Sequence, residues 1–146
     1  MLDPMKTCLL AFVLASGLAL AGELKIEDPW IRAVPPGSKA TAAFMTLSNS
    51  GEEKIVISGG VTPVAREVKP MITTKSKVDG QEVMGMEFVE SFSVDPGKKR
   101  VLEPGGDHIM LMKLKSVPKA GETVPLTLAF ESNGKKETRT LLVPVR

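Results

Sequence analysis

The residues best suited to chemistry in this sequence are a single histidine and the methionines around it. His108 is the only histidine among 146 residues, and it opens the segment HIMLMKLK, in which Met110 and Met112 occupy alternate positions. Alternate residues of a β-strand face the same side, so the imidazole and the two thioethers share one face. A borderline imidazole nitrogen combined with soft thioether sulfurs is a donor set that favours Cu(I).

A second group of methionines lies upstream of His108. Met84 and Met86 stand at alternate positions of the segment EVMGMEFVE, and Met71 ends the segment VAREVKPM. Methionine also fills irregular gaps in protein cores, so a purely structural role is the alternative explanation. Two features favour a metal site: five of the eight methionines fall between residues 71 and 112, and His108 comes directly after the loop EPGGD.

The sequence argues against other kinds of metal centre. Calcium needs clustered carboxylates, whereas Asp79, Asp95 and Asp107 lie in separate turns and suit turn formation. Structural zinc usually needs cysteines or several histidines, and a blue-copper centre needs a cysteine thiolate and a second histidine. The one cysteine, Cys8, lies in an N-terminal segment that we expect to be removed. Copper in the form of Cu(I) is therefore the predicted ion.

The first 21 residues have the features of a secretory signal peptide. A lysine precedes an apolar run over residues 8–20, and the small residues Ala19 and Ala21 suit cleavage after Ala21. The run is shorter than the stretch of about 18 apolar residues that a membrane anchor requires. We therefore expect a mature domain of residues 22–146 that does not span a membrane.

The expected cleavage also decides the compartment. It removes Cys8, which lies too early in the chain to carry a lipid at a cleavage site. A protein without thiols suits the bacterial periplasm, where free thiols are kept oxidised, because thioethers form no disulfides. We expect the mature protein to reside in the periplasm as a monomer.

The rest of the chain consists of short segments that would position the histidine and the methionines. Nine segments of alternating or mostly apolar character are separated by turns rich in Gly, Pro, Asn and Asp. Asn133-Gly134 between the last two segments predicts a tight hairpin, because both residues tolerate positive φ. The pattern predicts an all-β fold, an antiparallel β-sandwich of seven to nine strands. The segments are residues 29–34, 40–50, 53–60, 64–71, 82–90, 98–106, 108–115, 124–132 and 136–145.

Apolar residues of these segments are expected to fill the space between two sheets. Trp30 is expected to plug the core or its edge. The other predicted core residues are Phe44, Leu47, Ile55, Ile57, Leu126, Leu128 and Phe130.

Composition argues against two classes of function. The net charge is only +2, the lysines are scattered, and the chain has one Trp and no Tyr, which does not suit nucleic-acid binding. A lone histidine without an obvious carboxylate partner does not suit acid–base or triad catalysis. We therefore expect a binding protein and not an enzyme.

At the level of motifs the sequence resembles the PCu(A)C family of periplasmic copper chaperones, which have a cupredoxin-like β-sandwich. The family motif is His-x-Met, a methionine some ten residues later, twenty-one further residues and a closing His-x-Met. Here residues 87–107, twenty-one in all, separate Met86 from the segment HIM. PGGDHIMLMKLK is similar to the family signature PGGxHxMLxxL, and DPWIRAVPPGSKATAAFMTLSN is similar to its N-terminal opening. The similarity spans residues 25–145.

By this resemblance the expected Cu(I) ligands are Met71, Met86, His108 and Met110. Met84 is a possible replacement for Met86, but only Met86 keeps the family spacing.

The sequence departs from the family pattern in the length of one segment and at one position. The segment between Met71 and Met86, residues 72–85, has 14 residues and is longer than in the family by about a hairpin turn. The first histidine of the family corresponds to Lys69, which lies two residues before Met71. An ammonium group has no lone pair, and removing its proton at neutral pH is costly. We therefore expect Lys69 to be a poor ligand that points to solvent.

The resemblance implies a chaperone that carries Cu(I) and passes it by ligand exchange to the copper centre of a respiratory cytochrome oxidase subunit, or to another copper chaperone. Cu(II) prefers nitrogen and oxygen donors, so a site with one imidazole should select Cu(I). Two alternatives stay open. One is a divergent family member that has lost copper and acts as a periplasmic interaction module, and the other is a copper storage or resistance protein.

Overall fold

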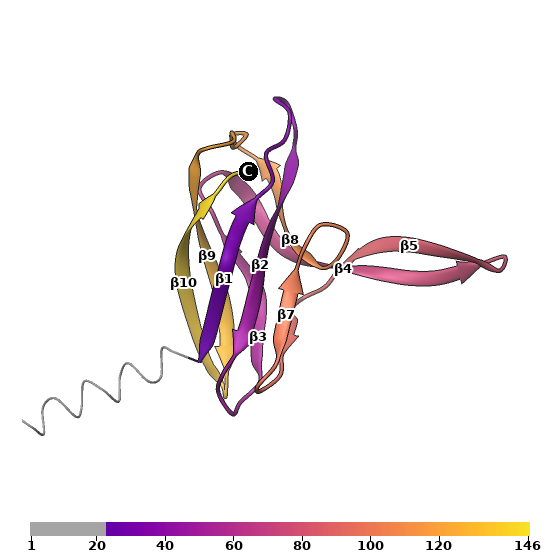
Figure 1. Ribbon diagram of the computed structural model, residues 1–146. Helices are drawn as coiled ribbons and strands as arrows, with labels where there is room; N and C mark the ends of the chain where they lie inside the picture. The colour runs from indigo at the N-terminus through magenta and orange to yellow at the C-terminus, as the bar shows by residue number, and fades with distance from the viewer. Residues whose placement is uncertain (1–22) are drawn as a thin grey trace, which may run out of the picture.

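The computed structural model describes residues 23–146, which form two antiparallel β-sheets packed against each other (Figure 1). The expected signal peptide, Cys8 and the cleavage site at Ala21 lie outside these residues. No helix within residues 23–146 has the length and apolar character needed to cross a membrane. The strands are β1 (Leu24–Ile31), β2 (Ala40–Asn49), β3 (Ile55–Val61), β4 (Ala65–Val78), β5 (Gln81–Phe88), β6 (Phe92–Val94), β7 (Lys99–Leu102), β8 (His108–Leu114), β9 (Thr123–Ser132) and β10 (Lys135–Pro144).

The two sheets confirm the predicted antiparallel sandwich. The larger sheet has the order β1-β2-β8-β4-β5, with β7 also paired to β2, and the smaller sheet has the order β10-β9-β3-β6. Nine of the ten strands overlap the nine predicted segments. The additional strand, β6, is only three residues long, which is too short for an alternating pattern to be recognised.

Two tight turns organise the hairpins. Asn133 and Gly134 have φ values of 52° and 77° and join β9 to β10, which confirms the predicted hairpin. Asp79 and Gly80, with φ values of 53° and 79°, join β4 to β5 in the same way. Positive φ at both central residues gives a turn whose twist matches that of the flanking strands.

The core lies between the sheets, and Phe44 is buried elsewhere. Ala43 and Met45 belong to the core cluster, so alternation turns Phe44 to the opposite, outer face of the larger sheet. There its ring packs against Trp30 with centroids 4.6 Å apart. Six predicted core residues do lie between the sheets, namely Leu47, Ile55, Ile57, Leu126, Leu128 and Phe130.

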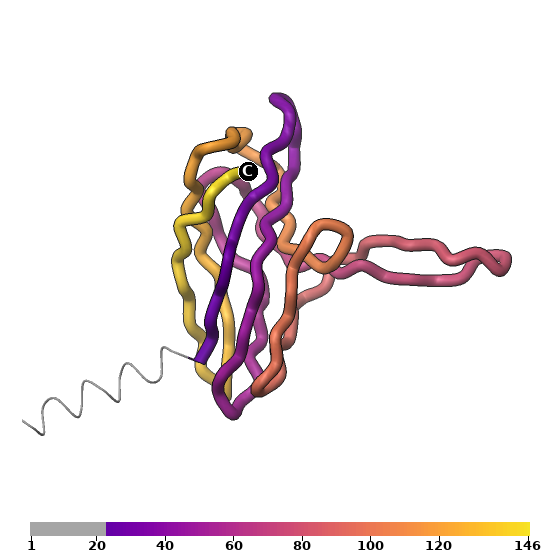
Figure 2. The backbone as a smooth tube through the Cα atoms, viewed as in Figure 1, coloured from indigo at the N-terminus to yellow at the C-terminus, as the bar shows by residue number. Residues whose placement is uncertain are grey.

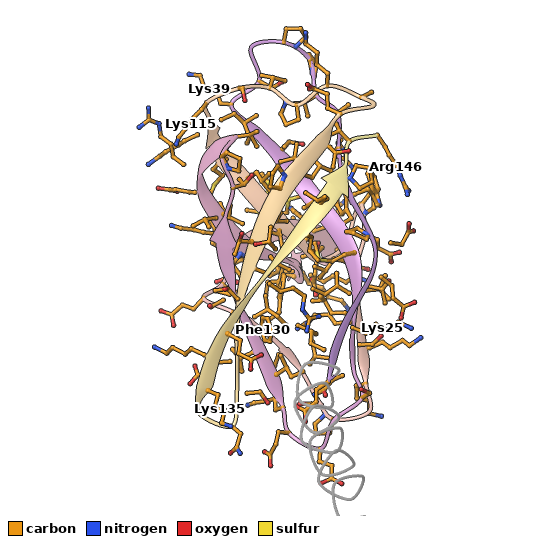
Figure 3. The ribbon with its side chains drawn as sticks, turned by 90° about the vertical axis from the view of Figure 1, so that its left-hand side faces the viewer. Lys25, Lys39, Lys115, Phe130, Lys135 and Arg146 are labelled. Carbon is orange, nitrogen blue, oxygen red and sulfur yellow. The ribbon has the colours of Figure 1, made fainter. Side chains whose placement is uncertain are left out.

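Lysines are spread over the outside of the sandwich. Lys25, Lys39, Lys115 and Lys135 are exposed, and their side chains project away from the body in different directions (Figure 3). This spread agrees with the scattered charge of the sequence.

Strand β4 belongs both to the sandwich and to a projecting hairpin. Its first half pairs with β8, and its second half, from Met71 onward, pairs with β5. Beyond Met71 the two strands leave the body together as a two-stranded arm (Figures 1 and 2). All eight residues of β5 are exposed. The methionines of β5 are thus carried on the arm, outside the core.

Strands β7 and β8 lie along the same strand, β2, and are separated by one loop. β2 pairs with β8 through its first half and with β7 through its second half. Loop 103–107 connects β7 to β8. Its two ends are joined by a hydrogen bond of 3.1 Å, which the Glu103 N–H donates to the Asp107 carbonyl oxygen. His108 is the first residue of β8 and directly follows this loop, so the loop determines the position of the imidazole.

Candidate metal centre

The predicted ligands of β8 lie on the outer face of the larger sheet. Ile109 and Leu111 are fully buried in the core cluster, so the alternating residues His108, Met110 and Met112 face away from it. His108 is nevertheless only 5% exposed. The imidazole is therefore a buried polar group outside the core, and such groups are normally hydrogen-bonded.

Strand β4 brings two more residues to this face. Met71 is the register partner of His108, and Lys69 is the register partner of Met110. Directly opposed residues of antiparallel neighbours lie on the same face, with Cβ atoms about 4.5–5.5 Å apart. Met71 is 8% exposed, so its side chain is buried beside the imidazole.

Strand β5 adds Met86 to the group. The β4–β5 register puts Met86 on the same face as Met71. Met86, His108 and Met110 together line a cavity of about 240 Å³. Met84 lies two residues farther along the arm. The geometry thus favours Met86 over Met84 as the middle ligand of the predicted set.

The orientation of the His108 ring is determined by its own loop. Nδ1 lies 2.9 Å from the carbonyl oxygen of Gly106. A carbonyl oxygen only accepts, so Nδ1 is the donor in this contact, and in the neutral ring the lone pair is then on Nε2. Metal-bound histidines are commonly held in this way, because a hydrogen bond at one nitrogen orients the other toward the ion.

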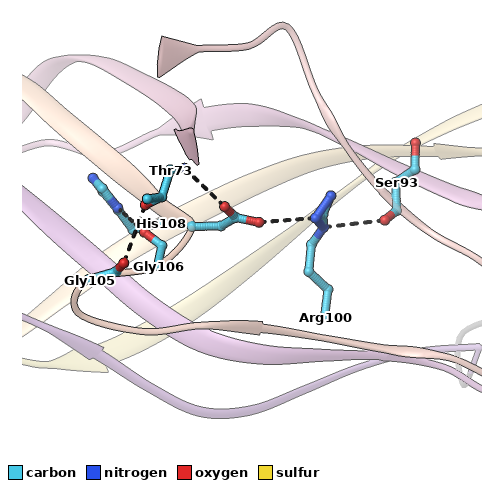
Figure 4. Close-up of polar contacts among 7 residues, drawn as sticks. Thr73, Ser93, Arg100, Gly105, Gly106 and His108 are labelled. Atoms are coloured by element: carbon cyan, nitrogen blue, oxygen red, sulfur yellow. Dashed lines mark hydrogen bonds and ion pairs between the residues drawn. The ribbon is translucent and has the colours of Figure 1, made fainter. Parts of the chain in front are cut away.

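Asp107 connects the loop before His108 to two neighbouring strands through Thr73 and Arg100, the two partners labelled in Figure 4. Its Oδ1 accepts a hydrogen bond of 3.2 Å from the Thr73 backbone N–H at the base of the arm. Its Oδ2 pairs with Arg100 Nη1 of β7 over 3.1 Å. Thr73 stands opposite Met86 in the register. Asp107 therefore fixes the arm that carries Met86 relative to the loop that carries His108.

The sequence did not reveal this role of Asp107. An aspartate after Pro-Gly-Gly suits turn formation, and turn formation alone explains its presence in the sequence. The signal that would have pointed to it is its place directly before the only histidine, because groups behind a metal ligand are commonly carboxylates.

We expect Asp107→Ala to weaken Cu(I) binding about tenfold, as happens when a group that orients the ligands of a metal site is removed. The substitution removes the shorter of two hydrogen bonds between Thr73 of the arm and loop 103–107, leaving the 3.4 Å bond from the Thr73 hydroxyl to the Gly105 carbonyl oxygen. It also leaves Arg100 without its carboxylate. Competition with a chromophoric Cu(I) chelator under anaerobic conditions measures the loss. Asp95→Ala, in another exposed turn, is the matched control. An equal loss in both variants would show that Asp107 does not position the site.

Lys69 is exposed, as expected, and it shares one carboxylate with Lys113. Its side chain is 55% exposed, and Nζ lies 3.8 Å from the Glu67 carboxylate. Lys113 Nζ donates a hydrogen bond of 2.8 Å to the same carboxylate. The hydrogen bond and the charge of Lys113, with a smaller effect of Lys69, lower the pKa of Glu67 below its ordinary value. An ionised Glu67 thus offsets positive charge beside Met110.

Comparison with known proteins gives a consistent set of relatives. Residues 24–145 match the family model described as "Putative lipoprotein LpqE-like". "Putative lipoprotein Lxx21020" of Leifsonia xyli subsp. xyli is 34% identical over 126 residues, which cover 86% of this chain and 71% of that protein. The solution structure of CuI-DR1885 from Deinococcus radiodurans is 34% identical with a TM-score of 0.64, over 90% of this chain and 85% of that one. The copper-bound PCuAC domain from PmoF2 is 22% identical with a TM-score of 0.65, over 86% and 95% of the two chains, and shares the fold.

Proposed function

Because the chain belongs to the LpqE-like family and has the fold of PCuAC domains, we propose that it binds Cu(I) and acts as a copper chaperone, not as an enzyme. The relatives confirm the resemblance predicted from the motifs. The observation that carries the proposal is one cavity lined by Met86, Met110 and His108, with Nδ1 of the imidazole 2.9 Å from the Gly106 carbonyl oxygen. The Cu(I) form of DR1885, at 34% identity, supports the choice of ion.

We assign the Cu(I) ligands to the sulfurs of Met71, Met86 and Met110 and to Nε2 of His108. Thioethers carry no proton, so binding requires only that the imidazole is unprotonated. Soft sulfur donors favour Cu(I) over the harder Cu(II). Met86 is 63% exposed. An acceptor can therefore reach the ion from the side of the arm and replace its ligands one at a time while the sandwich stays closed.

The destination of the ion is the second part of the proposal. We propose that the protein, as residues 22–146 after removal of a signal peptide, works in the bacterial periplasm. There it would pass Cu(I) to the copper centre of a cytochrome oxidase subunit or to another copper chaperone. The description of the family and of a curated relative as lipoproteins agrees with export. A ligand set without thiols also suits an oxidising compartment.

An anaerobic Cu(I) titration against a chromophoric chelator tests the proposal. One tightly bound equivalent is the expected result. Several equivalents would favour the storage or resistance alternative. Failure to compete with the chelator would refute copper binding and favour the alternative of an interaction module.

We expect Lys69→His to raise the Cu(I) affinity about tenfold, equivalent to about 1.4 kcal/mol. The new imidazole would stand opposite Met110 on the outer face and supply a nitrogen donor where the ammonium has none. Lys69→Gln removes the charge without adding such a donor and is the control. The same chelator competition measures both variants. If histidine has no larger effect than glutamine, position 69 lies out of reach of the ion.

A further inference from the structure

The proposed site leaves Met84 without a role. This side chain is 58% exposed on β5, and Val83, Met86 and Phe88 beside it are exposed as well. The strand belongs to the arm that projects from the sandwich (Figure 2). A concentration of exposed apolar side chains on a soluble protein commonly marks a site of interaction. The two thioethers give this site a specific chemistry.

Met84 and Met86 lie on the same face of the arm, and Met84 is farther from the body. Met86 stands opposite Thr73, whereas Met84 stands opposite Lys75, which is two residues closer to the tip. Alternate residues of a strand are about 7 Å apart. Methionine side chains are long and flexible. Two thioethers at this spacing can contact a single ion.

The positive charge opposite Met84 lies close to a carboxylate, which also stands opposite Lys77 in the register. Lys75 Nζ lies 3.8 Å from the Glu82 carboxylate, and Glu82 is on β5 of the same arm. Thr73, opposite Met86, carries no charge. A Cu(I) ion held by the two sulfurs would therefore not face an isolated ammonium group.

We infer that Met84 and Met86 form an outer transfer site, which Cu(I) occupies between the cavity and its acceptor. The inference rests on the proposed function and extends it. Met86 belongs to both ligand sets, so the ion can move along the arm without being released to water. Met84 thus becomes the group that first meets an incoming acceptor.

The transfer is a ligand exchange. The bond from copper to Nε2 of His108 breaks, as do the bonds to the sulfurs of Met71 and Met110, and a bond to the Met84 sulfur forms. Copper stays Cu(I) and no electron moves, and each released donor keeps its own lone pair. A soft ligand of the acceptor then displaces the two remaining thioethers.

The test separates the rate of transfer from the affinity. The Cu(I)-loaded protein is mixed with excess bicinchoninate in an anaerobic stopped-flow instrument, and Kd is measured by titration. We expect Met84→Leu to slow transfer about tenfold and to change Kd less than about twofold, because the barrier changes and the resident ligands do not. Met112→Leu removes a thioether from the same sheet face, but on β8, and should transfer copper at the original rate.

Each contrary outcome has its own meaning. An unchanged transfer rate in Met84→Leu would overturn the transfer site and leave the proposed function standing. A loss of affinity in Met84→Leu as large as that in Met86→Leu would also overturn it, because Met84 would then be a resident ligand. A protein that binds no Cu(I) would refute the proposed function, and the transfer site with it.

Discussion

His108→Ala is expected to lower the Cu(I) affinity at least about a hundredfold, since groups that merely support metal ligands already change affinity by about 10–100-fold. The substitution removes Nε2, the only nitrogen donor of the assigned set. It also removes Nδ1, through which the Gly106 carbonyl oxygen orients the ring. The three methionines that remain of the assigned set would bind the ion more weakly. The loss should exceed that of every other single substitution considered for this site.

The measurement is the anaerobic competition with a chromophoric chelator, carried out beside Met84→Leu. The leucine variant should change the affinity far less, because Met84 lies outside the cavity on the arm. Thermal unfolding of both variants shows whether the fold is retained, since His108 is a buried residue. Equal and negligible effects of the two substitutions would remove His108 from the site.

Gly60→Ala is expected to destabilise the fold by about 3 kcal/mol, at the upper end of the usual cost of overpacking. Gly60 pairs with Leu128 between β3 and β9 of the smaller sheet. A Cβ atom at this position would overlap the backbone carbonyl oxygen of Thr127. Backbone cannot move aside as a flexible side chain can, so the two strands would have to separate. A loss of this size is a large fraction of the stability of an ordinary domain.

Urea unfolding measures this effect, with Gly106→Ala as the matched control. A Cβ atom at Gly106 would meet its nearest neighbours, atoms of Glu103, at 3.5 Å, which is an ordinary contact. The control should therefore change the free energy of unfolding by less than about 1 kcal/mol. Equal midpoints for the two variants would contradict the close approach of β3 and β9. Cu(I) affinity of the folded Gly60→Ala protein should be unchanged, because the site is on the other sheet.

The sequence by itself determined the class of fold and the kind of ligand. Alternation and turn chemistry act over a few consecutive residues, so the strands and the hairpin at Asn133-Gly134 were predicted from local segments. Side chains that alternate along one strand share a face wherever the strand lies. The common face of His108 and Met110 therefore required no knowledge of the fold. The chemical softness of their donor atoms is likewise a property of the residues alone.

Only the tertiary structure decided which strands meet and which face of each is covered. Met71 lies beside His108 because β4 pairs with β8. Met86 lines the cavity because β5 pairs with β4 at the base of the arm. Such pairing depends on contacts between distant segments, which local periodicity does not specify. Phe44 shows the same limit, because the apolar run around it does not reveal which residues face the core. The role of Asp107 also required the fold, since its partners lie on two other strands that come together only when the sandwich forms.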